Sequence, residues 1–122
     1  MQNYKKSKYN AKKIEKYNRV WDSKAELLYY ELIEDKSKVK CQEKFVLQDK
    51  FRLNGKAYRE IYYKPDFTFY DDAGNLIKVI DVKGMILPEF KIKAKMFAAR
   101  YGLPITIAKK VARKDEFKES VI

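Results

Sequence analysis

Asp66, Asp81 and Lys83 are the residues whose types and spacing most directly indicate chemistry. Asp66 opens a run of strand-forming residues, and Asp81 closes the next such run after a polar turn. If the two runs pair as antiparallel strands, the carboxylates lie nearly opposite each other at one end of a sheet. Converging carboxylates repel unless a cation lies between them, and Mg²⁺ needs only one or two carboxylates besides water and substrate phosphate.

Lys83 follows Asp81 by two residues, so on a regular strand both side chains point to the same face. An ammonium there could position or deprotonate a water, or balance negative charge on a phosphate. The three residues therefore predict a unit for phosphodiester hydrolysis with Mg²⁺ or Mn²⁺. Two alternatives stay open: Asp66 caps a strand after Pro65, and Asp81 and Lys83 form a surface ion pair.

The composition of the 122-residue chain excludes several other chemistries. It contains no histidine and a single cysteine, Cys41, which excludes His-based triads and leaves few suitable ligands for zinc. What remains is carboxylates, Lys, Tyr and a hard, oxygen-bound metal, with no small-molecule cofactor expected. No apolar run approaches the ~20 residues that span a bilayer. A lone cysteine is typical of a reducing compartment, so we expect a cytoplasmic protein.

The net charge of +11 is concentrated in the first residues of the chain. Residues 1–19 carry seven Lys or Arg and one acidic residue, with Lys12 and Lys13 as candidate nucleic-acid contacts. Basic residues on a basic domain favour a polyanion partner, most often nucleic acid, although a solubilising tail is the simpler alternative. We divide the chain into a basic N-terminal arm (1–19), a domain (20–109) and a basic C-terminal tail (110–122).

Local signals predict the elements that position these side chains. Ser23 and Glu26 have the spacing of a capping box, which starts a helix over residues 23–35. Asn54-Gly55 indicates a hairpin, and Pro88 and Gly102 are typical of the start and end of a second helix. Strands are expected over residues 38–47 (in imperfect register), 65–70, 76–82 and 105–108, with a mobile or partly helical arm and a frayed or helical tail. The predicted class is α/β, an α+β arrangement with a mixed sheet.

Pro65-Asp66 followed by Asp81-Val82-Lys83 resembles the signature of the PD-(D/E)XK nuclease superfamily. The expected order also resembles its restriction-endonuclease-like αβββαβ core, here with an extra hairpin. Residues 21–26, 63–84 and 89–93 are further similar to segments of small phage and prophage members, some of which act on Holliday junctions. The resemblance extends over about residues 20–107.

The resemblance implies roles for individual residues. It makes Asp66 and Asp81 metal ligands, Lys83 the catalytic lysine, and Glu26 the helix acid that adds a ligand or holds a metal-bound water. Glu26 has an alternative role, because it also completes the capping box. Lys91, Lys93 and Lys95 resemble helix lysines that contact phosphate in relatives; the alternative is a solvated helix face.

Together these features predict a metal-dependent endodeoxyribonuclease that acts in phage recombination or DNA processing. A small basic domain suits backbone and shape contacts, so we expect cleavage of Holliday or other branched junctions and not of one sequence. Cutting two strands needs two sites, which favours a homodimer. Two alternatives remain: a catalytically silent DNA-binding subunit of a recombination, transposition or packaging complex, and a basic RNA- or ribosome-associated protein.

Overall fold

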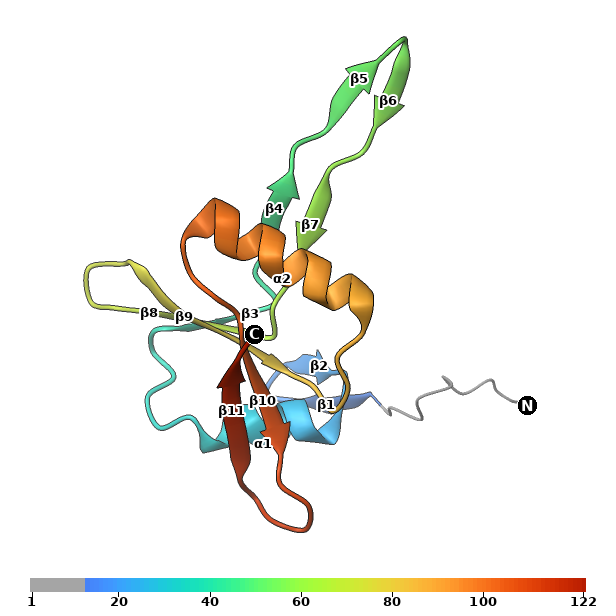
Figure 1. The fold of residues 1–122 in the computed structure, drawn as a ribbon. Helices are drawn as coiled ribbons and strands as arrows, with labels where there is room; N and C mark the ends of the chain where they lie inside the picture. Colours follow the sequence, from blue (N-terminus) through green and yellow to red (C-terminus); the bar gives the residue numbers. More distant parts are fainter. Residues whose placement is uncertain (1–12) are drawn as a thin grey trace. The chain divides into compact units, whose positions relative to one another are not determined.

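Two helices and eleven strands make up residues 13–122, the part of the chain that the computed structural model describes (Figure 1). The chain divides into two compact units, and the boundary falls between Glu34 and Asp35. The mixture of helices with a mixed sheet agrees with the predicted α+β class.

The first unit begins with a β-hairpin where the sequence predicted a mobile or partly helical arm. Strands β1 (Ile14–Lys16) and β2 (Arg19–Trp21) pair as antiparallel neighbours. Tyr17 and Asn18 connect them with φ angles of 57° and 60°, the left-handed pair that a tight two-residue turn requires. The prediction is therefore wrong for this part of the arm, and residues 1–12 lie outside the described residues.

Helix α1 (Lys24–Leu32) follows the hairpin and packs against it. Its N-cap is Ser23, as predicted, and the Ser23 Oγ accepts a hydrogen bond from the Glu26 N–H at 3.1 Å. The ring of Trp21 lies 4.9 Å from that of Tyr30. The helix ends earlier than residue 35, because Ile33 already has an extended backbone.

The second unit is built on a five-stranded sheet with the order β11-β10-β9-β8-β3. Strands β9 and β10 are parallel and the other neighbours are antiparallel. A parallel pair needs a long crossover connection, which helix α2 provides. The strands are β3 (Val39–Cys41), β8 (Phe67–Tyr70), β9 (Leu76–Val82), β10 (Thr106–Lys110) and β11 (Phe117–Val121).

Strand β11 corrects the prediction that the C-terminal tail is frayed or helical. All five of its residues pair with β10, from Phe117 opposite Lys110 to Val121 opposite Thr106. The connecting turn includes Arg113 at a φ of 63°. The tail therefore forms an edge strand of the main sheet.

A long two-stranded ribbon, residues 45–63, is inserted between β3 and β8. Strand β4 (Phe45–Gln48) pairs with β7 (Ile61–Tyr63), and β5 (Phe51–Leu53) pairs with β6 (Lys56–Tyr58) beyond them. The Asn54-Gly55 hairpin is confirmed, with φ angles of 50° and 80°. The expected strand over residues 38–47 is interrupted at Gln42, whose φ is 56°, so that β3 and β4 belong to different sheets.

Helix α2 (Pro88–Tyr101) covers one face of the sheet and ends at Gly102, as predicted. Phe90, Ala94 and Phe97 are buried and form one apolar stripe along the helix. They join a core that also contains Phe45, Leu47, Tyr63, Val79, Ile105 and Ile107. Neither helix of the described chain is long and apolar enough to cross a membrane.

Candidate functional site

Asp66 and Asp81 lie at the same end of the β8–β9 pair, as the hairpin argument predicted. The register sets Phe67 opposite Ile80, so the two aspartates come directly beyond this pair on neighbouring strands. Asp66 is half-buried, and Asp81 is 5% exposed. Two carboxyl groups thus lie at one end of the sheet. That of Asp66 is near the surface, and that of Asp81 is in the interior.

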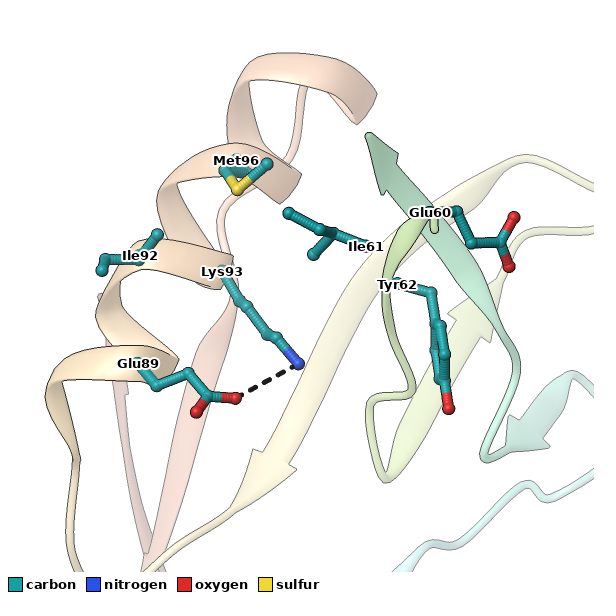
Figure 2. A pocket seen from close by; sticks show the side chains of 7 residues that line it. All are labelled: Glu60, Ile61, Tyr62, Glu89, Ile92, Lys93 and Met96. Carbon is teal, nitrogen blue, oxygen red and sulfur yellow. Dashed lines mark ion pairs between the residues drawn. The ribbon is translucent and has the colours of Figure 1, made fainter. Parts of the chain in front are cut away.

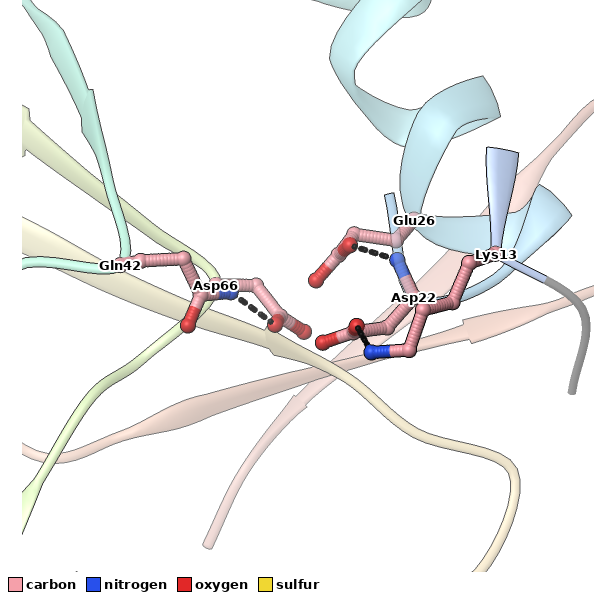
Figure 3. Close-up of polar contacts among 5 residues, drawn as sticks. All are labelled: Lys13, Asp22, Glu26, Gln42 and Asp66. Carbon is pink, nitrogen blue, oxygen red and sulfur yellow. Dashed lines mark hydrogen bonds and ion pairs between the residues drawn. The ribbon is translucent and has the colours of Figure 1, made fainter. Parts of the chain in front are cut away.

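The Asp66 carboxylate is held from two sides. The Val82 N–H donates to Oδ2 at 2.8 Å, and the Gln42 Nε2 donates to Oδ1 at 3.1 Å (Figure 3). Gln42 reaches this position because it leaves β3 with a left-handed backbone, and its own N–H donates to the Asp66 carbonyl oxygen at 3.3 Å. The interruption after β3 therefore serves to fix Asp66.

The Asp81 carboxylate has a hydroxyl donor and an ammonium as neighbours. The Tyr63 hydroxyl donates to Oδ2, and the Lys83 Nζ lies 3.6 Å from Oδ1. Burial raises the pKa of Asp81, whereas the Lys83 charge and the hydrogen bonds with Tyr63 and Asp66 act to lower it. Burial is the largest influence, so the pKa of Asp81 is raised overall. A cation beside this carboxylate would favour its charged form and so lower the pKa.

Tyr63 connects this site to the core of the second unit. Its ring centroid lies 6.0 Å from those of Phe90 and Phe97. Burial raises the pKa of its hydroxyl far above the usual range, and the negative charges of Asp81 and Asp66 raise it further. Tyr63 therefore keeps its proton and acts as a permanent hydrogen-bond donor to Asp81.

Lys83 lies on the same face as Asp81, as its spacing predicted. Its Nζ is 4.5 Å from the ring centroid of Phe90, which gives a cation–π contact. The Lys83 N–H also donates to the carbonyl oxygen of Ala108 at 3.1 Å, which extends the β9–β10 ladder. The ammonium is thus positioned between a buried carboxylate and an aromatic face, and its side chain is 29% exposed.

The Asp66–Asp81 pair fits a hard divalent cation. Residues 13–122 contain no group of three or more His, Cys, Asp or Glu side chains that could hold a metal ion. Mg²⁺ is commonly bound by one or two carboxylates, with water and substrate phosphate as the other ligands. Two carboxyl groups in mutual contact, one of them buried, are a donor set of this kind.

Glu26 belongs to the first compact unit, and its contacts there are those of a helix cap. Its Oε1 accepts a hydrogen bond from the Asp22 N–H at 3.1 Å (Figure 3). In a capping box the Glu26 side chain would accept this bond from the N–H of the N-cap residue, Ser23. Here the donor is instead the residue before the N-cap, Asp22. Glu26 is buried, at 6% exposure. Its role as a metal ligand stays a prediction.

The predicted nucleic-acid lysines differ in their surroundings. Lys91 and Lys95 are exposed on α2, whereas Lys93 is half-buried and forms an ion pair with Glu89 at 3.4 Å. Lys13 is exposed and lies 3.3 Å from Asp22 (Figure 3). Lys12 lies outside the described residues.

Lys93 also lines a groove of ≈ 700 Å³ between α2 and strand β7. Figure 2 shows its side chain extending from α2 toward Glu89 at the edge of this groove. The other lining residues are Glu60, Ile61, Tyr62, Ile92 and Met96. Lys93 is thus engaged in a local contact, while its two neighbours on α2 are the more accessible cations.

Sequence reasoning missed the supporting roles of Tyr63 and Gln42. Neither residue was among the predicted site residues. Two signals were present: a tyrosine beside a Pro-Asp pair needs a partner for its hydroxyl when buried, and the break in strand pattern at Gln42 marked a special backbone. Neither signal identifies the carboxylate that each side chain contacts.

A protein family described as "Protein of unknown function (DUF1064)" matches residues 6–115. The matched segment is most of the chain, so the chain belongs to this family. No curated protein and no solved structure matches the sequence significantly.

Proposed function

We propose that this protein is a Mg²⁺- or Mn²⁺-dependent endodeoxyribonuclease whose active site contains Asp66, Asp81 and Lys83. The observation that carries the proposal is the pairing of a buried and a half-buried carboxyl group at one sheet end, with an ammonium 3.6 Å from the buried one. This combination suits an oxygen-bound cation next to a phosphate-directed lysine.

The order of elements supports a restriction-endonuclease-like core. Along the chain, α1, β3, β8, β9, α2 and β10 follow the αβββαβ order of the PD-(D/E)XK superfamily, and the ribbon is an insertion between β3 and β8. The Asp81-x-Lys83 pair is at the end of β9, the third of these strands. In this assignment Asp66 is the acid of Pro-Asp and Asp81 that of Asp-x-Lys.

In the proposed reaction, water adds to phosphorus and one phosphorus–oxygen ester bond breaks. A bound cation supplies Lewis-acid polarisation of the phosphate. Asp66 and Asp81 would hold it, and their orientations are fixed by the donors from Gln42, Val82 and Tyr63. These donors keep the carboxylates in place before substrate binds, so little reorganisation is needed during the reaction.

Lys83 would orient the attacking water or neutralise charge that develops on the phosphate. Its Nζ lies 3.6 Å from Oδ1 of Asp81, and the Phe90 ring limits its motion. Glu26 is proposed as an additional acid of the site, and Lys91, Lys93 and Lys95 as phosphate contacts. We further propose a homodimer acting on branched DNA, because cleavage of two strands requires two sites.

The test is a cleavage assay with a four-way junction, a flap and a linear duplex. The wild-type protein is expected to cut DNA in Mg²⁺ or Mn²⁺, and to cut the junction fastest. It should cut none of the three DNAs in EDTA. Asp81→Asn should bind the same DNAs without cutting them. If the folded wild-type protein binds DNA but cuts none in either metal, the nuclease proposal is rejected. The protein would then be a catalytically silent DNA-binding subunit.

A further inference from the structure

The tip of the ribbon, residues 50–59, is basic and exposed. It carries Lys50, Arg52, Lys56 and Arg59 and contains no acidic residue. Each residue from 50 to 59 is exposed to solvent. In Figure 1 strands β5 and β6 lie at the end of the ribbon that is remote from α2 and the five-stranded sheet.

Acidic residues at the base of this tip are neutralised by cations outside it. Asp49 lies 3.3 Å from the Arg100 guanidinium of α2, and Glu60 lies 2.5 Å from Lys44. Among residues 13–122, none of the four basic residues of the tip forms an ion pair with an acidic side chain. The positive charge of the tip therefore remains available to a polyanion.

The two faces of the tip differ in character. Phe51 pairs with Tyr58 across the strands, and their rings stack at 4.7 Å and an interplanar angle of 4°. Arg52 projects to the opposite face, because neighbouring residues of a strand alternate. Phe51, Leu53 and Tyr58 are 42%, 55% and 38% exposed, so these apolar side chains cover no core.

An isolated two-stranded hairpin is only marginally stable, so this tip needs local support. The stacked Phe51–Tyr58 pair and the left-handed Asn54-Gly55 turn provide it, and the Arg52 guanidinium donates to the Gly55 carbonyl oxygen at 2.8 Å. At the base, the Tyr101 hydroxyl of α2 donates to the Val46 carbonyl oxygen at 2.7 Å. The ribbon is thus stiffened although it buries little surface.

We propose that the ribbon tip inserts into the major groove of duplex DNA, where Lys50, Arg52, Lys56 and Arg59 contact phosphates on both sides. The major groove of B-form DNA is ~12 Å wide and admits a two-stranded ribbon. The choice of DNA as the partner rests on the proposed nuclease function. The ribbon tip is thus a DNA-binding element separate from the Asp66–Asp81 site and from α2.

The experiment measures binding of the full chain to a labelled linear DNA duplex by fluorescence anisotropy over a range of salt, in EDTA to prevent cleavage. Each lost phosphate contact reduces the salt slope by about 0.9. Lys50→Gln/Arg59→Gln should therefore lower the slope by about 2 and weaken binding at least about tenfold at moderate salt. Both side chains are exposed, so the melting temperature should stay that of wild type.

The matched control is Lys109→Gln/Lys118→Gln. These exposed lysines face each other across β10 and β11, so the variant loses the same charge from another surface. Its affinity should change by less than about threefold. Wild-type affinity in the ribbon variant, or an equal loss in the control, would overturn the inference.

An RNA duplex of the same sequence tests the groove itself. The A-form major groove is deep and narrow and does not admit a ribbon. Binding to the RNA duplex should be weaker than to DNA and insensitive to Lys50→Gln/Arg59→Gln. An equal effect of this variant on both duplexes would contradict insertion into the groove.

Failure of this inference is distinguishable from failure of the proposed function. Ribbon-dependent DNA binding by a wild-type protein that never cuts DNA would support the inference and reject the nuclease. DNA cleavage in Mg²⁺ with ribbon-independent binding in EDTA would reject the inference and support the nuclease.

Discussion

The Tyr63 hydroxyl donates a hydrogen bond to Oδ2 of Asp81, while its ring packs among the core residues of the second unit. One residue is thus shared by the hydrophobic core and the candidate metal site. The packing of α2 on the sheet, through Phe90 and Phe97, consequently sets the position of the buried carboxylate. Changes at this tyrosine should affect stability and the site together.

Tyr63→Phe keeps the aromatic ring but removes the hydroxyl that donates to the buried Asp81. The variant should therefore be less stable than wild type. The expected loss in the free energy of unfolding is roughly 1–3 kcal/mol, measured by urea denaturation in EDTA. Tyr58→Phe, at an exposed ribbon position, is the control and should change stability by less than about 0.5 kcal/mol. Equal stability of the two variants would contradict a structural role for this hydrogen bond.

Mg²⁺ or Mn²⁺ should raise the melting temperature of the wild-type protein, since a cation held by Asp66 and Asp81 would bind only their native arrangement. At a concentration of about 100 times Kd the stabilisation is ~2.7 kcal/mol. Asp66→Asn should reduce this rise, and the control is Asp72→Asn, in which an exposed turn carboxylate is lost. A full metal response in Asp66→Asn would remove Asp66 from the set of ligands.

Gln42 combines a side-chain contact with an unfavourable backbone, and two substitutions separate these effects. Gln42→Ala loses the bond to Asp66 and keeps the left-handed φ of 56°. Gln42→Gly loses the same bond but removes the steric cost of that φ, so it should be ~1 kcal/mol more stable than Gln42→Ala. Chemical denaturation of both variants is the measurement, and the opposite order would contradict strain at this residue.

Tyr70 gives a pH dependence of stability in alkaline solution. Burial, followed by the hydrogen bond to Glu43 and its charge, raises the pKa of Tyr70 to about 12 in the folded protein. The folded state therefore holds this proton more tightly than the unfolded state, whose tyrosine pKa is about 10. The resulting stabilisation is complete below pH ~10 and is lost as the pH rises toward 12.

Tyr70→Phe should remove this dependence. The difference in unfolding free energy between wild type and variant is expected to shrink from pH ~9 to pH ~12, by less than about 1 kcal/mol because Tyr70 is only partly buried. Urea denaturation of both proteins at each pH provides the measurement. A constant difference across this range would show that Tyr70 titrates normally.

Features set by neighbouring residues were predictable from the sequence. Ser23 at the start of α1, the Asn54-Gly55 turn and Gly102 after α2 act within a few residues, and the structure has all three. The meeting of Asp66 and Asp81 followed from one hairpin register. Such local rules were enough to place Glu26 on α1 and Asp81 on β9, with Asp66 directly before β8 and Lys83 directly after β9.

Features that depend on distant residues were not predictable. Strand β11 is a polar, exposed edge strand that exists through its pairing with β10, and its sequence has no apolar alternation to indicate it. Gln42 contacts a residue 24 positions away, and Tyr63 one 18 positions away. The β1–β2 hairpin turns at Tyr17-Asn18, where a tyrosine with positive φ is an unusual turn residue.

The most direct test of the account is the single-turnover rate of DNA cleavage in Mg²⁺ by wild type, Asp66→Asn and Asp72→Asn. If Asp66 and Asp81 hold the catalytic cation, Asp66→Asn should be slower by at least about a hundredfold. Each tenfold loss in rate corresponds to ~1.4 kcal/mol of lost transition-state stabilisation. Asp72→Asn should cleave within about twofold of wild type. Equal rates for Asp66→Asn and wild type, or no cleavage of any DNA by folded wild-type protein in Mg²⁺ or Mn²⁺, would contradict the account.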